Sequence, residues 1–195
     1  MTLDADPHAD RRSPSAARVV IRQATSADAR ATGTLAAERE ADEPRRCVDH
    51  HRRRLADPDH RLFVAEVDGI VVGYGWVSFL RPVLGGGHGA PDGWYLSGIF
   101  VAPEARRRGL GCALTRARIA WALAREDEVY YVVSSADLAS QRLHRSLGMV
   151  EVTRDFALPG QVFTRCEGIL CRLDRSPGAE VIDLAARRSR SARNP

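Results

Sequence analysis

The sequence of 195 residues predicts a single α/β domain, a mixed sheet flanked by helices. Runs rich in β-branched and aromatic residues alternate with helical stretches, in the order strand, helix, helix, three strands, helix, strand, helix and two strands. Asp68-Gly69 separates two of the β-rich runs, and this dipeptide is the strongest short signal for a hairpin. The length fits one domain better than two, because domains typically run to about 100–150 residues.

The first half of the chain is expected to form a strand, two helices and the hairpin. Residues 25–28 offer N-cap chemistry to an alanine-rich helix that reaches about Glu40. Asp57-Pro58-Asp59 ends the second helix, because proline cannot continue it. The second helix is expected at residues 45–55, and the strands at residues 18–22, 62–67 and 70–79.

The second half is expected to add four strands and two helices. Residues 85–89 are nearly all glycine and predict a flexible loop, and Pro103 stops the strand that follows it. Asp137 opens a helix that ends at Leu147-Gly148, where the glycine is the stop signal. The strands are expected at residues 94–101, 130–133, 149–157 and 167–173, and the first helix at about residues 109–125.

The chain contains no lysine, so all 29 of its Lys+Arg positions are arginine. This excludes phosphate loops that end in Gly-Lys-Ser/Thr, Schiff-base lysines and kinase-type phosphate lysines. Any anion that the protein binds must therefore be held by arginine, by backbone amides or by the end of a helix.

The two ends of the chain carry opposite charge and leave a nearly neutral middle. Residues 1–17 are slightly acidic and residues 175–195 are basic, and both are expected to be disordered tails of a domain at residues 18–174. A basic face with interleaved aromatic residues is missing, which argues against nucleic acid as a partner. With no signal peptide, no apolar run of about 18 residues and no C-x-x-C pair, we expect a cytoplasmic protein with reduced thiols that binds no membrane.

A turn between Pro103 and the following helix is the most informative segment. Three consecutive arginines and two glycines follow the strand, and the helix begins at once with Ala113-Leu114. Glycine lets a backbone approach a ligand closely, and converging amides at a helix N-terminus bind anions. Arginines beside such a turn add forked hydrogen bonds to phosphate, so a diphosphate fits the segment.

The pattern Val101-x-Pro103 followed by Arg106-x-x-Gly109-x-Gly111 resembles the acyl-CoA-binding motif of the GNAT superfamily of N-acetyltransferases. The resemblance implies a GNAT-type, largely antiparallel mixed sheet, acetyl-CoA as the acyl donor and no metal. It also implies that the strand faces pantetheine and the thioester and that the turn binds the pyrophosphate. The strand residues are Ile99, Phe100 and Val101, and the turn residues are Arg106, Arg107, Arg108, Gly109, Leu110, Gly111 and Cys112.

The turn has two other interpretations. A dinucleotide-binding Rossmann motif requires a third glycine where Leu114 stands and a parallel sheet, whereas Asp68-Gly69 requires a hairpin. A solvated basic turn that merely caps a core helix is the remaining structural alternative.

A second match covers Val133 to Met149 and resembles the strand and helix that follow in the GNAT superfamily, so the resemblance spans residues 18–173. Asp137 stands where asparagine is usual, Ser140 replaces alanine, and both are expected to border the cofactor. His144 replaces a tyrosine often assigned as the general acid to the departing CoA thiolate. His144 either protonates that thiolate or only packs the helix against CoA.

The family's mechanism implies direct attack of an amine on the thioester in a ternary complex. No acid lies in the strands beside the expected thioester, so the general base is open. Glu167, at the start of the last strand, is our hypothesis, and a water-relayed base is equally consistent. The other acidic candidates are Glu38, Glu40, Asp42 and Glu43.

Cysteine chemistry offers two alternatives to this mechanism. Cys112, at a helix N-terminus beside arginines, would suit a covalent acyl-enzyme, although a small residue near phosphate explains it as well. Cys47, His50 and His51 share a helical face at metal-like spacing, but the sequence shows no fourth ligand and we expect no metal.

The sequence therefore predicts an N-acetyltransferase that acts on a primary amine of a small molecule, as a monomer or homodimer. Residues 149–170 look similar to aminoglycoside acetyltransferase-like members, which makes an aminoglycoside-like polyamine one candidate acceptor. The alternatives are a catalytically silent acyl-CoA-binding regulatory module, favoured by the replaced tyrosine, and an acetyltransferase of a protein N-terminus.

Overall fold

The computed structural model describes residues 17–81, 89–158 and 167–175. The predicted tails, apart from residues 17 and 175, and most of the predicted glycine-rich loop lie outside these ranges. No helix of the described ranges is long and apolar enough to cross a membrane.

Seven strands form one mixed sheet in the order β1-β2-β3-β4-β5-β7-β6. β4 and β5 run parallel and all other neighbouring strands run antiparallel, which confirms the predicted mixed and largely antiparallel sheet. The expected hairpin joins β2 to β3. The strands are β1 Val19–Gln23, β2 His60–Val67, β3 Ile70–Leu80, β4 Gly93–Val101, β5 Glu128–Ser134, β6 Val150–Thr153 and β7 Gly168–Asp174.

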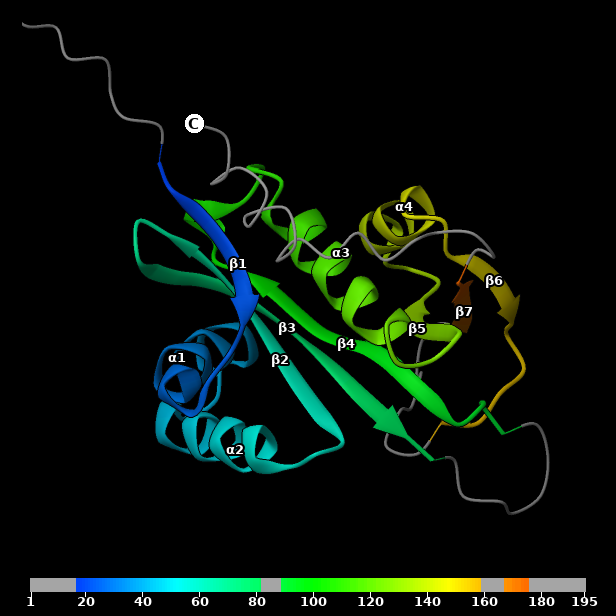
Figure 1. Ribbon diagram of the computed structural model, residues 1–195, viewed down its shortest axis with the longest axis horizontal. Helices are drawn as coiled ribbons and strands as arrows, with labels where there is room; N and C mark the ends of the chain where they lie inside the picture. Colours follow the sequence, from blue (N-terminus) through cyan, green and yellow to red (C-terminus); the bar gives the residue numbers. More distant parts are fainter. Residues whose placement is uncertain (1–16, 82–88, 159–166, 176–195) are drawn as a thin grey trace, which may run out of the picture.

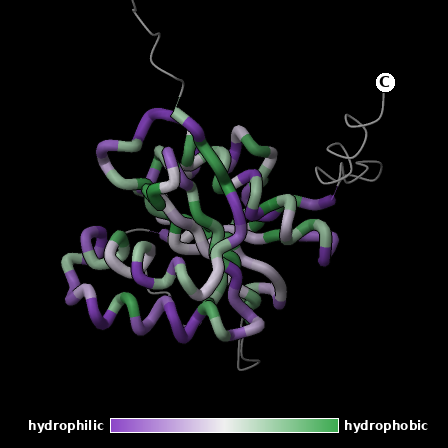
Figure 2. The backbone as a smooth tube through the Cα atoms, turned by 60° about the vertical axis from the view of Figure 1, so that its left-hand side comes forward, coloured by the Kyte–Doolittle hydropathy of each residue, from purple (hydrophilic) through white to green (hydrophobic). Residues whose placement is uncertain are grey.

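Helices cover both faces of the sheet (Figure 1). Side chains alternate along β2, so that Leu62 and Val64 pack with α1 and α2, whereas Phe63 and Ala65 pack with α3. Hydrophobic stretches accordingly run through the middle of the molecule, and hydrophilic ones lie mainly around it (Figure 2). The helices are η1 Ser26–Asp28, α1 Ala29–Glu40, α2 Pro44–Ala56, η2 Pro103–Ala105, α3 Leu110–Leu123 and α4 Leu138–Ser146.

The strand expected at residues 149–157 is shorter than predicted. β6 ends at Thr153 because the chain turns there: the Thr153 hydroxyl accepts a hydrogen bond from the Asp155 amide at 3.1 Å. Ala157 then forms an isolated bridge with Gly89. The short η2 helix after β4 was not predicted, and the other expected elements are found within a few residues of their predicted bounds.

A β-bulge in β4 separates this strand from β5. Gly98 has φ +48°, and the pairing with β3 shifts between Tyr74 and Trp76, so the bulge places an extra residue in β4. β4 pairs with β5 at Tyr95 and Leu96 alone. Beyond Leu96, the edge of β4 on the β5 side pairs with no strand of the described ranges, and the sheet opens there.

Arg118 on α3 holds the bulge in place. Its buried guanidinium donates hydrogen bonds to the carbonyls of Trp76 at 3.1 Å and Ser97 at 3.2 Å, and to the Thr115 hydroxyl at 3.0 Å. No carboxylate of the described ranges pairs with it. Gly75 makes room for the guanidinium, because a Cβ atom there would lie 2.9 Å from Arg118 Nε.

We predict that Gly75→Ala lowers the free energy of unfolding by about 1–3 kcal/mol, because the added methyl group displaces the Arg118 guanidinium from the bulge carbonyls. Urea unfolding would measure the loss. Gly111→Ala is the matched control, since a Cβ at Gly111 meets no atom within 4 Å. Equal stability of the wild type and Gly75→Ala would show that Arg118 does not need this space.

Candidate active site

The turn before α3 presents a row of free backbone amides. Arg107 has φ +58° and Gly109 has φ +75°, and this left-handed backbone folds the segment tightly over the start of the helix. The amides of residues 107–112 donate no hydrogen bond to any described backbone group, as expected for a helix N-terminus. The open space beside Gly111 leaves room for a ligand. The turn therefore has the backbone geometry that suits an anion.

A groove of about 530 Å³, here called the turn groove, runs from this turn along β4 to α4. Asp137 forms part of its wall and also caps α4, accepting a hydrogen bond from the Ser140 amide at 3.0 Å. Of the residues that the sequence assigned to the cofactor, Arg108 alone does not line the groove. The lining ones are Ile99, Phe100, Val101, Arg106, Arg107, Gly109, Leu110, Gly111, Cys112, Asp137 and Ser140.

A central cavity of about 470 Å³ lies where β4 and β5 separate. It shares Ile99, Asp137 and Ser140 with the turn groove, so the two are adjacent. Arg118 and His144 line it as well.

A third cavity of about 340 Å³, here called the helix-side cavity, lies between α1, α2 and the bulge of β4. Arg39, Arg54 and Gly98 line both this cavity and the central one. The three cavities therefore adjoin in a row that leads from the turn, past the bulge, to the face covered by α1 and α2.

His144 is a neutral imidazole at the central cavity. Its Nδ1 lies 2.9 Å from the carbonyl oxygen of Ser140, which can only accept, so Nδ1 carries the hydrogen. Nε2 then presents a lone pair, and it is buried without a hydrogen-bond partner in the described ranges. The ring stacks on Tyr131 at 3.5 Å, and burial lowers the pKa of His144 to about 4.

Two of the acidic candidates, Glu40 and Asp42, line the helix-side cavity. Asp42 accepts a hydrogen bond from the Glu43 amide and lies 3.5 Å from Arg46. Glu43 caps α2 by accepting from two backbone amides. Of the two acidic candidates that line the helix-side cavity, Glu40 is thus the one with no ion pair in the described ranges.

The remaining acidic candidates lie away from the three cavities. Glu167, our hypothesis for the base, forms an ion pair with Arg154 at 3.0 Å and has a side chain that is 68% exposed. Glu38 is exposed on α1 and lines none of the cavities.

The cysteine and histidine face of α2 is part of the core. His51 Nδ1 lies 2.9 Å from the Thr32 hydroxyl, which itself donates to the carbonyl of Asp28, so His51 donates to Thr32. Cys47 is buried, and the described ranges contain no group of three or more His, Cys, Asp or Glu side chains placed to hold a metal ion.

The arginines of the central cavity, Arg39, Arg54 and Arg118, were not predicted from the sequence. Arg118 had a signal: it falls four and eight residues after Leu114 and Leu110, on the buried stripe of α3, where an arginine is out of place. Arg54 stood in a run of arginines on α2 and gave no such signal.

An α/β fold with an amide-lined turn beside two separating parallel strands has the architecture of an acyl-CoA-dependent acyltransferase. A family model described as the acetyltransferase (GNAT) family matches residues 28–149. The chain therefore belongs to the acetyltransferase (GNAT) family, and the predicted enzyme class, an acetyl-CoA-dependent N-acetyltransferase, follows from that membership.

Curated relatives and solved structures agree with this assignment. Aminoglycoside N(6')-acetyltransferase type 1 of Serratia marcescens is 34% identical over 107 residues, which cover 53% of this chain and 71% of that protein. The enzyme of the same name from Stenotrophomonas maltophilia is 32% identical over 140 residues, covering 69% and 88%. The structure of a ribosomal-protein-alanine N-acetyltransferase from Brucella melitensis is similar with a TM-score of 0.61 and 26% identity, covering 80% of this chain and 99% of that one.

We predict that Arg107→Gln weakens CoA binding at least tenfold, because Arg107 lines the turn groove and would lose a charged hydrogen bond to phosphate. Arg108→Gln is the matched control. This adjacent arginine does not line the groove, so its loss should change affinity less than threefold. Calorimetric titration with CoA distinguishes the two variants, and equal losses would contradict the assigned orientation of the turn.

We predict that His144 makes stability depend on pH. An unfolded histidine of pKa about 6.5 takes up a proton before the folded one of pKa about 4. The stabilisation is therefore complete above pH 6.5 and is lost, by up to about 3 kcal/mol, as the pH falls toward 4. Urea unfolding of the wild type and His144→Gln from pH 7 to 4.5 should show a shallower decline for the variant. Parallel curves would contradict the neutral, buried state.

Proposed function

We propose that this protein transfers an acetyl group from acetyl-CoA to a primary amine of a small molecule by direct attack in a ternary complex. The observation that carries the proposal is the row of three adjoining cavities through the opening between β4 and β5. Acetyl-CoA would occupy the turn groove with its thioester in the central cavity, and the amine would arrive from the helix-side cavity. Donor and acceptor could then meet without an intermediate carrier.

The reaction must remove two protons from the ammonium form of the acceptor and return one. A base takes the first, the nitrogen attacks the thioester carbon, and the carbonyl oxygen becomes anionic. The C–S bond then breaks with its electron pair on sulfur. The nitrogen loses its second proton and the CoA thiolate gains one. A backbone amide on the unpaired edge of β4 beyond Leu96 would stabilise the oxyanion.

His144 fits the transfer of the second proton. A neutral imidazole holds no proton at Nε2, so it cannot act as an acid until it has first acted as a base. The Nδ1 hydrogen bond to the Ser140 carbonyl fixes the ring with the Nε2 lone pair available. His144 would accept the proton from the attacking nitrogen and pass it to the departing sulfur.

Glu40 is better placed than Glu167 to take the first proton. Both side chains are exposed, but Glu40 lines the helix-side cavity, through which the amine would enter, whereas Glu167 lines none of the three cavities and is paired with Arg154. A base must come within hydrogen-bond reach of the ammonium group, directly or through one water. The lining position favours Glu40.

The class of acceptor is the finer part of the proposal. The curated relatives are named for aminoglycosides, which supports a small-molecule amine and makes a polyamine of that kind one candidate. The Brucella melitensis structure is named for an acetyltransferase of a ribosomal protein, so a protein N-terminus must be tested beside small molecules.

The test is release of free CoA thiol from acetyl-CoA with panels of amino acids, aminoglycosides and peptides with free N-termini. We expect turnover of a small-molecule amine. Tight CoA binding without turnover of any amine would instead support the silent binding module.

With the best acceptor of this panel, Glu40→Gln should lower kcat/KM about 100-fold and remove the acidic limb of its pH profile. Glu167→Gln, the matched control, should stay within twofold of the wild type. The opposite pattern would assign the base to Glu167.

A further inference from the structure

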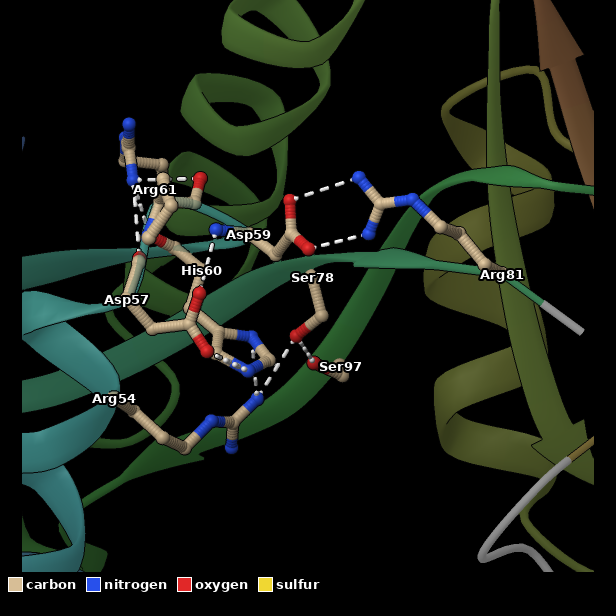
Figure 3. Close-up of polar contacts among 9 residues, drawn as sticks. Arg54, Asp57, Asp59, His60, Arg61, Ser78, Arg81 and Ser97 are labelled. Atoms are coloured by element: carbon tan, nitrogen blue, oxygen red, sulfur yellow. Dashed lines mark hydrogen bonds and ion pairs between the residues drawn. The ribbon is translucent and has the colours of Figure 1, made fainter.

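Arg54 on α2 projects its guanidinium to the boundary between the central and helix-side cavities. It lies 4.4 Å from the centre of the Trp76 ring, and its Nη2 donates to the Ser78 hydroxyl at 2.8 Å. Figure 3 shows Arg54 reaching from its helix toward Ser78 and Ser97. The side chain is thus held in one direction by the ring beneath it and by β3 in front of it.

Two of the three nitrogens of this guanidinium are available to a ligand. Nη2 also lies 3.3 Å from His60 Nδ1, which must accept because arginine can only donate. His60 Nε2 then carries its hydrogen toward Asp57, 3.6 Å away, so Asp57 pairs with His60 and not with Arg54 (Figure 3). Nε and Nη1 of Arg54 form no hydrogen bond within the described ranges. The free N–H groups of Nε and Nη1 point in different directions, so a carboxylate would accept a charged hydrogen bond from one of these two nitrogens.

The central cavity has an excess of positive charge. Arg39, Arg54 and Arg118 line it, and none of them forms an ion pair with a described carboxylate. Asp137 is the one acidic residue in its described lining, and it caps α4. The two internal segments that the structure does not describe, residues 82–88 and 159–166, contain no Asp or Glu. A partly buried guanidinium with no anionic partner gains most from an anion that arrives with the ligand.

We propose that the acceptor is an amine that carries a carboxylate, an amino-acid-type molecule, and that Arg54 binds this carboxylate. The inference rests on the proposed function and names the acceptor class for the same site. A polycation of the aminoglycoside kind would instead be repelled by the three arginines.

The position of Arg54 suits the reaction. The Ser78 hydroxyl that it contacts lies 3.1 Å from the Ser97 hydroxyl, and Ser97 directly precedes Gly98 in the bulge. A carboxylate on Arg54 therefore holds the attached amino group close to the opening between β4 and β5. Glu40 lines the same helix-side cavity and supplies the negative charge for the ammonium group.

The test compares amino acids with their carboxamides, which lack the negative charge, and with aminoglycosides, which are polycations. Initial rates of thiol release are measured for a panel of amino acids, for their carboxamides and for aminoglycosides. The wild type should show a kcat/KM at least tenfold higher for the best acid than for its amide. Arg54→Gln should abolish this ratio, and Arg54→Lys, which keeps the charge and loses the planar guanidinium, should restore part of it. Arg52→Gln, on the exposed side of the same helix and paired with Asp49 in the wild type, should leave the ratio unchanged.

Each outcome decides between the claims. A preference for the amides or the aminoglycosides overturns the inference and leaves the proposed function standing, and so does an acid preference that survives in Arg54→Gln. Absence of turnover with every amine overturns the proposed function. In that case, calorimetry on CoA-saturated protein tests the inference. The wild type should bind the amino acid more tightly than its carboxamide, and Arg54→Gln should lose this difference. Equal binding by the wild type, or a difference that persists in Arg54→Gln, overturns the inference.

Discussion

The contact between the Arg118 guanidinium and the carbonyls of the β4 bulge underlies the rest of the site. A bulge leaves carbonyl groups without ladder partners inside the sheet, and such groups are costly to bury unsatisfied. Arg118 donates to two of them, from Trp76 and Ser97, and stays charged without a described carboxylate beside it. Gly75 gives the guanidinium its space. Because hydrogen bonds from Arg118 replace those that a neighbouring strand would provide, β4 stays displaced from β5.

The separation of β4 from β5 creates the space in which a donor and an acceptor could meet. It frees the edge of β4 for a donor, and it joins the turn groove on the α3 and α4 face to the helix-side cavity on the α1 and α2 face. His144 lines the cavity at this opening, where its burial keeps it neutral and its Nε2 lone pair has no described partner. The positive charge of Arg118 is also part of the field that an acceptor meets in the central cavity.

Short sequence motifs predicted the features of the fold that depend on residues close together in the chain. The turn at residues 106–112, the Asp68-Gly69 hairpin and the Asp137 cap all depend on neighbours within a few positions, and each is found where expected. The arginines of the central cavity, Arg39, Arg54 and Arg118, were not predicted, because their positions depend on strand register and on which helix face meets the bulge. Glu167 illustrates the same limit: it directly precedes β7 in the sequence, yet its side chain is exposed and pairs with Arg154, away from the three cavities.

The central claim is direct transfer between two ligands that meet in the opening of the sheet. Intact-mass spectrometry of the enzyme with acetyl-CoA alone tests this claim most directly. Initial-rate kinetics with both substrates varied accompany it. The account predicts no acetylated enzyme and intersecting double-reciprocal lines, because the amine attacks the thioester itself. An acetyl group found on Cys112, discharged by added amine and accompanied by parallel lines, would contradict it.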